Sequence, residues 1–144
     1  MNEGYLVQEP AANATASVQL VVADSDLARA VALEPGDVFP AVLATARMVA
    51  LMEVASARVL RPFLGEGEMS VGVSVDVEHT APTPVGATVT ATARYLGRDG
   101  KLFLFQVVAA DAGGEVGRGR HKRAIINAER LERGAARRTG QPVS

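Results

Sequence analysis

At 144 residues, 48% of them apolar, the chain suits one compact domain with a sizeable hydrophobic core. A formal net charge of −1 argues against a general nucleic-acid binder, and the absence of cysteine excludes disulfides and thiolate chemistry. No run approaches the roughly 20 apolar residues of a membrane span, and residues 1–10 lack the apolar segment of a signal peptide, so we expect a cytoplasmic protein that does not bind membranes.

The first elements in the chain are short. Residues 16–22 predict a strand, and residues 24–33 predict a short helix with Asp24 or Ser25 as its cap. The Glu-Pro-Gly-Asp sequence at residues 34–37 indicates a turn.

The longest apolar stretch, residues 42–60, predicts a helix because alanine, leucine and methionine dominate it. Apolar side chains lie on nearly every side of this helix, so we expect it to be buried. Pro62 and Gly65 are expected to end it.

The remainder of the chain predicts antiparallel strands joined by short turns. Residues 69–77 alternate methionine or valine with polar residues or glycine, the pattern of a half-buried strand. Further strands are expected at residues 87–96, 102–110 and 116–126.

A strand, one buried helix and then about four strands indicate an α+β fold in which an antiparallel sheet wraps around a central helix, the hotdog architecture. We expect residues 1–144 to form a single hotdog domain with its core at residues 15–127, followed by an Arg-rich tail at residues 128–144. One such sheet has an open edge and covers only part of the helix, which predicts a homodimer that extends the sheet.

Glu53 stands among small or apolar helical neighbours. Loss of hydration raises the pKa of a carboxyl group and makes it a better base or nucleophile near neutral pH. The alternative is a structural glutamate paired with Arg47 or Arg58, or one that points out of a groove.

His79 continues the valine face of the strand at residues 69–77, which should place its imidazole near the helix surface that carries Glu53. It is either a general acid or base or a core histidine bonded to a backbone carbonyl. Two isolated histidines predict no metal site. Thr45 lies near the helix start, where threonine is a common N-cap and where free N–H groups could bind an oxyanion.

Thr45 and Glu53 are eight residues apart, about 12 Å along a straight helix. They can meet only if the chain bends or if two chains contribute to one site. Gly72 interrupts the outer face of its strand, as a bulge or at a close approach of a ligand or another backbone.

The last strand carries bases on both faces. Arg118, Arg120 and Lys122 share one face, which could bind phosphates of a coenzyme or simply be solvated. Arg123 lies on the opposite, more buried side.

Four blocks of sequence resemble the fluoroacetyl-CoA thioesterase family, in the order and spacing of that family. They are the helix segment at residues 39–53 (FPAVLATARMVALME), the turn and strand at residues 65–72 (GEGEMSVG), His79-Thr80-Ala81, and residues 117–123 (GRGRHKR). The resemblance runs from about residue 38 to residue 126.

The resemblance implies that Thr45, Glu53 and His79 form the catalytic set. It also implies that the Gly72 N–H helps to hold the thioester carbonyl, that Arg123 lies at the site, and that Phe39 gates the acyl pocket. The family has a second lid aromatic where this chain has Gly36, which implies a smaller or more mobile lid.

The function expected from this resemblance is hydrolysis of a short-chain acyl-CoA thioester, of which fluoroacetyl-CoA is one candidate. Coenzyme A would then be part of the substrate, and no separate cofactor is expected. Two alternatives stay open: a hotdog hydratase or dehydratase acting on acyl thioesters, and a non-catalytic acyl-CoA-binding module.

Overall fold

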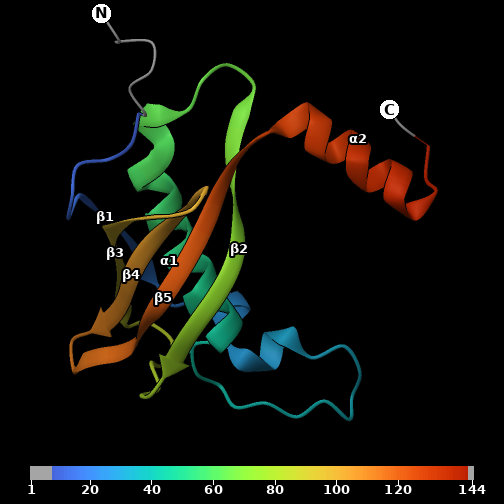
Figure 1. The fold of residues 1–144 in the computed structure, drawn as a ribbon. Helices are drawn as coiled ribbons and strands as arrows, with labels where there is room; N and C mark the ends of the chain where they lie inside the picture. The colour runs from blue at the N-terminus through green and yellow to red at the C-terminus, as the bar shows by residue number, and fades with distance from the viewer. Residues whose placement is uncertain (1–7, 143–144) are drawn as a thin grey trace, which may run out of the picture.

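The computed structural model describes residues 8–142 as a five-stranded antiparallel sheet folded against one long helix, α1 (Thr45–Leu60) (Figure 1). The strands are β1 (Thr15–Val21), β2 (Glu68–His79), β3 (Thr88–Asp99), β4 (Leu102–Asp111) and β5 (Gly114–Asn127). Their spatial order is β1-β3-β4-β5-β2. This arrangement confirms the predicted α+β hotdog fold.

The core lies between α1 and the inner face of the sheet. The strands β3 and β4 alternate buried and half-buried residues, as expected of central strands with one face toward a helix. The ring centroids of Tyr95 and Phe105, cross-strand partners on this face, are 5.6 Å apart. The helix side of the core is formed by buried residues Met48, Leu51, Met52, Ala55, Ser56, Val59 and Leu60.

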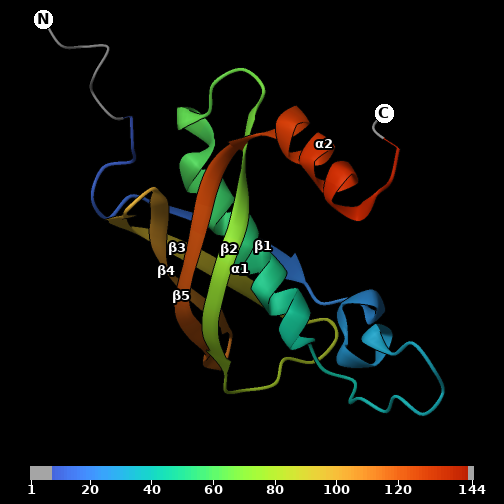
Figure 2. The same cartoon turned by 45° about the vertical axis from the view of Figure 1, so that its right-hand side comes forward.

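The sheet covers only one side of α1, so the prediction of a helix buried on nearly every side is wrong for the single chain. Val54, on the uncovered side, is 41% exposed, and the Glu53 side chain is 42% exposed. Figure 2 shows α1 lying across the face of the sheet with one side open. A second copy of the chain is one way to cover that side.

The helix begins at Thr45, three residues later than predicted. Residues 42–44 are extended because their backbone pairs with another segment: the Ala28 N–H donates to the Val42 carbonyl, and Leu43 forms an isolated bridge with Leu27. The same pairing holds Leu27 extended, so the helix predicted at residues 24–33 is instead two separate 3₁₀ turns, Asp24–Asp26 and Ala28–Val31.

A bulge between Gly72 and Ser74 changes the face on which β2 presents its side chains. Before the bulge Gly72 is paired with buried Arg123, and after it Val77 is paired with Gly119 on the same inner face. The valines of residues 69–77 therefore do not share one face as predicted. Gly72 lies on the inner face, and its prediction as an outer-face residue is wrong.

The Arg-rich tail contains a helix, α2 (Ala128–Thr139), which was not predicted from the sequence. The Asn127 side chain accepts a hydrogen bond from the Arg130 N–H at its start, and Gly140 ends it in the left-handed conformation. No residue of α2 is buried, and Figures 1 and 2 both show it standing off the sheet. No helix within residues 8–142 is long and apolar enough to cross a membrane.

Candidate active site

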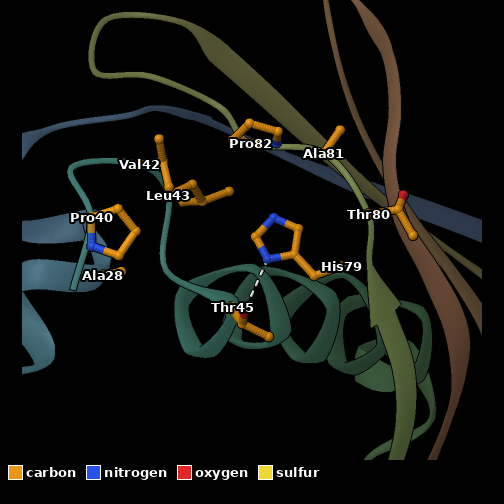
Figure 3. Close-up of a pocket in the computed structure, with 9 residues that line it drawn as sticks. All are labelled: Ala28, Pro40, Val42, Leu43, Thr45, His79, Thr80, Ala81 and Pro82. Carbon is orange, nitrogen blue, oxygen red and sulfur yellow. Dashed lines mark hydrogen bonds between the residues drawn. The ribbon is translucent and has the colours of Figure 1, made fainter.

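Thr45 and His79 are in direct contact at one end of the sheet. The Thr45 hydroxyl and His79 Nδ1 are hydrogen-bonded at 2.8 Å (Figure 3). The N-cap of α1 is Ala44, and no side chain caps the helix there. The threonine hydroxyl is therefore committed to the imidazole rather than to the helix, which contradicts the capping alternative for Thr45.

The other ring nitrogen of His79 lies beside a cavity of about 380 Å³. This Nε2 atom is buried and has no hydrogen-bond partner among residues 8–142. The cavity walls are mostly apolar, formed by Ala28, Pro40, Val42, Leu43, Ala81 and Pro82. Buried polar atoms are normally satisfied, so the unpartnered Nε2 sets His79 apart from the other residues that line the cavity.

Phe39 lines a second cavity, of about 210 Å³, which shares Thr45 and Ala28 with the first. Its other walls are the small or apolar side chains of Val31, Ala44 and Ala46. The Phe39 side chain is 47% exposed. Thr45 thus borders both cavities, the first together with His79 and the second together with Phe39.

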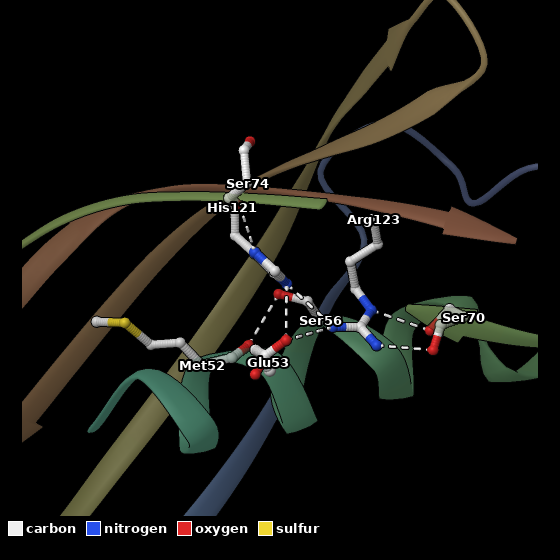
Figure 4. Close-up of polar contacts among 7 residues, drawn as sticks. All are labelled: Met52, Glu53, Ser56, Ser70, Ser74, His121 and Arg123. Atoms are coloured by element: carbon white, nitrogen blue, oxygen red, sulfur yellow. Dashed lines mark hydrogen bonds and ion pairs between the residues drawn. The ribbon is translucent and has the colours of Figure 1, made fainter. Parts of the chain in front are cut away.

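Glu53 lies further along α1 and is held by the sheet. The Arg123 Nη1 donates to Glu53 Oε1 over 3.3 Å (Figure 4). The partners proposed from sequence for a structural glutamate, Arg47 and Arg58, are occupied elsewhere: Arg47 pairs with Asp26 at 2.9 Å, and Arg58 donates to the Ser17 carbonyl. Glu53 is half exposed rather than desolvated, and Arg123 sets the position of its carboxylate.

Ser70 and His121 orient Arg123, and neither was assigned to the site from the sequence. Arg123 Nε donates to the Ser70 hydroxyl and Nη2 to the Ser70 carbonyl, both over 2.9 Å. The His121 Nδ1–H donates to the Ser74 carbonyl, so its Nε2 is free to accept from Arg123 Nη1 at 3.0 Å. The signal in the sequence is the spacing of His121 and Arg123, which puts both on the inner face of β5.

The electrostatics of this group agree with a neutral His121. Its side chain is 1% exposed, and this burial, together with the charge of Arg123, lowers the pKa of His121. The hydrogen bond to Ser74 and the charge of Glu53 act in the opposite direction. A neutral imidazole can accept from Arg123, whereas a protonated one would repel it.

Gly72 lies against the Glu53 carboxylate. A Cβ atom at this position would collide with Glu53 Oε1 and would be 3.1 Å from His121 Cε1. Its φ is not in the left-handed region, so close approach rather than backbone conformation is the reason for glycine. The group that closely approaches Gly72 is therefore the Glu53 side chain of the same chain.

The structure thus divides the three expected catalytic residues between two clusters. Thr45 and His79 form one, and Glu53 lies with Gly72 and Arg123 in the other, about 12 Å further along the helix axis. His79 is on the inner face as predicted, but it faces the start of α1 rather than Glu53. Within one chain α1 has no bend that would bring Thr45 and Glu53 together.

The outer-face bases of β5 lie on the other side of the sheet from both clusters. Arg118 forms an ion pair with Glu115 at 2.8 Å, and Lys122 forms one with Asp99 at 2.6 Å. The charges of Arg118 and Lys122 are therefore partly neutralised, and the solvated alternative fits these two residues better than a phosphate site.

Comparisons with known proteins identify the family of the chain. The family model for fluoroacetyl-CoA-specific thioesterases matches residues 22–129, a span that contains every candidate residue from Phe39 to Arg123. The fluoroacetyl-CoA thioesterase of Streptantibioticus cattleyicolor is 45% identical over 93 residues, covering 65% of this chain and 67% of that protein.

Solved structures of thioesterases are also similar to this chain. The fluoroacetyl-CoA thioesterase FlK superposes with a TM-score of 0.82 at 36% identity, over 94% of this chain and 100% of that chain. A thioesterase superfamily member from Thermus thermophilus superposes with a TM-score of 0.78 at 29% identity, over 94% of each chain. The chain belongs to the fluoroacetyl-CoA-specific thioesterase family.

Proposed function

We propose that this protein hydrolyses short-chain acyl-CoA thioesters to the free acid and coenzyme A, at a site formed by two copies of the chain. The observation that carries this proposal is the Glu53 carboxylate, held by Arg123 against Gly72 on the edge strand β2. Membership of a thioesterase family supports the reaction, and forms of the relative FlK have been solved with acetyl-CoA and with fluoroacetate and coenzyme A.

The edge strand β2 explains how two copies would complete the site. It is 12 residues long and open on one side, and its side chains Val73 and Val75 are 52% and 45% exposed. An edge of this kind is suited to pairing with a second strand. When residue 73 of the bulge is left out of the ladder, antiparallel pairing of two β2 strands about an axis at Asp76 sets His79 opposite the partner's Gly72.

The same twofold axis brings the Thr45–His79 cluster of one chain next to the Glu53 cluster of the other. Because Thr45 contacts His79 and Glu53 contacts Gly72, the partner's Glu53 comes beside Thr45 and His79. Each dimer then has two equivalent sites, each with residues from both chains. This arrangement accounts for the separation of Thr45 and Glu53 in the single chain.

Glu53 is the central reacting group in the proposed mechanism. In one route its carboxylate attacks the thioester carbonyl, coenzyme A leaves as the thiolate and takes up a proton, and water opens the resulting anhydride to regenerate Glu53. In the other, Glu53 removes a proton from water, the resulting hydroxide adds to the carbonyl, and coenzyme A leaves as the thiolate and takes up the proton. Both routes need the carboxylate beside the carbonyl and backbone N–H groups, that of Gly72 among them, to stabilise the oxyanion.

His79 and Thr45 have supporting roles in this proposal. The Thr45 hydroxyl orients both the imidazole and the partner's Glu53, and His79 Nε2 points toward the acyl cavity, where it carries protons. Arg123 keeps the Glu53 carboxylate aimed at the substrate, while Ser70 and His121 keep Arg123 from turning away.

The lid predicts broad selectivity among small acyl groups. Phe39 lines the second cavity. A Cβ atom at Gly36 would have no neighbour within 4 Å, so the loop at Gly36 does not cover that cavity. We therefore expect acetyl and propionyl thioesters to be accepted along with the fluoroacetyl thioester, rather than strong discrimination by the lid.

A panel of thioesters tests the proposed function. Acetyl-, propionyl-, fluoroacetyl-, longer acyl- and aryl-CoA are incubated with the protein, and free thiol is measured. We expect release from the short acyl esters and weaker release from the long ones. Hydration of crotonyl-CoA without free thiol would instead identify a hydratase, and binding of coenzyme A without turnover of any ester would identify a binding module.

A further inference from the structure

The helix α2 stands off the body of the chain with its apolar face exposed. Leu131, which shares this face with Ala128 and Ala135, is 46% exposed, and no residue of the helix is buried. The family match ends at residue 129, so membership of the family does not account for α2. A helix with one apolar face normally packs that face against another surface, which residues 8–142 of the single chain do not supply.

α2 lies beyond the open edge of the sheet. Figures 1 and 2 both show it past β2, on the side where β2 has no neighbouring strand. The Ala128 N–H donates to the Gly67 carbonyl over 3.0 Å, which holds the first residue of the helix level with the start of β2. A second copy of the chain that pairs along β2 therefore comes up against α2.

The register of the proposed β2 pairing identifies the segment that α2 would meet. Each step beyond the pair formed by Gly72 and the partner's His79 moves back one residue in one chain and forward one in the other. Continued in this way, the register sets the partner's Pro84 level with Gly67, and so with the start of α2.

The loop after β2 is apolar and exposed, as a docking surface for α2 requires. Pro82 and Pro84 are exposed, and Val85 is 48% exposed. Leu131 lies in the first turn of α2, close to the level of this loop in the partner. Contact between these side chains would remove apolar surface of both chains from water, which is favourable.

Charges on the two surfaces have opposite signs. Arg130, Arg137 and Arg138 of α2 form no ion pair within residues 8–142. The same is true of Glu78, which is exposed near the end of β2. Attraction between the bases of α2 and the partner's Glu78 would favour this approach of the two chains over others.

We infer that α2 is an arm that packs on residues 82–85 of a second copy of the chain, with Leu131 as its apolar contact, and so stabilises the dimer. This rests on the proposed function, because it takes the shared site to form along β2. By symmetry each dimer has two such arms, one at each end of the paired strands. Since each site needs both chains, α2 affects the reaction only through the fraction of protein that is dimeric.

Disulfide formation between engineered cysteines tests the contact, because the natural chain has no cysteine. In the Leu131→Cys, Val85→Cys double variant the two thiols of one chain are separated by the length of β2, about 40 Å for 12 residues. The thiols of two chains are adjacent if the arm docks as inferred. After mild oxidation we therefore expect a covalent dimer on a denaturing gel without reductant.

Ser17→Cys combined with Val85→Cys is the matched control, because Ser17 is exposed on β1, at the opposite edge of the sheet. This control should stay monomeric on the same gel. The absence of a covalent dimer from the Leu131→Cys, Val85→Cys protein would overturn the inference.

Sedimentation of Leu131→Ser measures what the arm contributes. We expect the dissociation constant of the dimer to rise about tenfold, which is the effect of removing one buried leucine contact. The specific activity of the variant should then fall on dilution at about tenfold higher protein concentration than that of wild type, and the two rates should agree where both proteins are dimeric. Val21→Ser, which removes an exposed valine from β1, should dissociate as wild type does.

The failure of the arm and the failure of the proposed function give different results. If wild type releases thiol but Leu131→Ser has the wild-type dissociation constant, the arm is excluded and the hydrolase stands. A wild-type protein that is monomeric at every concentration also excludes the arm. If wild type releases no thiol from any ester, the proposed function fails, and disulfide formation and sedimentation still decide whether α2 docks on a second copy.

Discussion

Replacing Glu53 by glutamine is expected to lower the rate of coenzyme A release by about a hundredfold to ten-thousandfold. Glutamine keeps an oxygen that can accept from Arg123 and nearly the same volume, so the Arg123 cluster and the fold should persist. It has no carboxylate to attack the carbonyl or to activate water, so both routes in the proposed mechanism are blocked. The measurement is free thiol release at saturating acetyl-CoA.

Glu66→Gln is the control for this experiment, since Glu66 lies exposed in the turn before β2. It should behave as wild type in the same assay. If Glu53→Gln turns over as fast as wild type while its thermal unfolding is unchanged, Glu53 is not the central group and the mechanism must be abandoned.

Gly72→Ala is expected to lower kcat/KM by about a hundredfold, because the new methyl group would collide with Glu53 Oε1 and displace it. The Glu53 side chain is flexible and half exposed, so it can move aside and the fold should survive. The displaced carboxylate would lose its alignment with the carbonyl. We therefore expect a large loss of activity with only a small change in the free energy of unfolding.

Gly134→Ala provides the comparison. Gly134 lies in α2, far along the chain from the site, where an added methyl group would meet nothing within 4 Å and φ is not left-handed. This substitution should leave activity unchanged and stabilise the exposed helix by up to about 1 kcal/mol. A Gly72→Ala protein with kcat/KM within twofold of wild type would show that Glu53 does not need the space beside Gly72.

The regular elements of the fold could be predicted from the sequence because local patterns determine them. Alternation of apolar residues marks β3 and β4, and the alanine-, leucine- and methionine-rich stretch marks α1. The start of α1 could not be predicted in this way, since residues 42–44 have good helix propensity but pair with residues 26–28 of a distant segment. Tertiary hydrogen bonding overrides local propensity there.

The prediction that the apolar residues of β2 share one face was wrong for a similar reason. Strict alternation over residues 69–77 suggests one continuous apolar face, but the bulge after Gly72 moves the side chains before it to the other face. Gly72 indicated a bulge as one alternative, and the register shift between Gly72 and Ser74 confirms it, but the alternation of valines alone does not show which face the residues before the bulge occupy. The packing of Glu53 against Gly72 becomes visible only in the structure.

The candidate site could be predicted as a set of residues, but its arrangement could not. Resemblance to a family singled out Thr45, Glu53 and His79, and helix geometry predicted that Thr45 and Glu53 do not touch within a straight helix. The roles of Ser70 and His121 depend on cross-strand contacts with Arg123. Such contacts follow from strand register, which the sequence alone does not specify.

The most direct test of a site shared between two chains is complementation between two inactive variants. His79→Asn and Glu53→Gln variants with different tags are co-expressed, and the heterodimer is purified through both tags. If each site takes His79 from one chain and Glu53 from the other, the heterodimer has one intact site of two and should recover about half of the wild-type activity, while either homodimer stays inactive. A heterodimer as inactive as its parents would contradict a shared site.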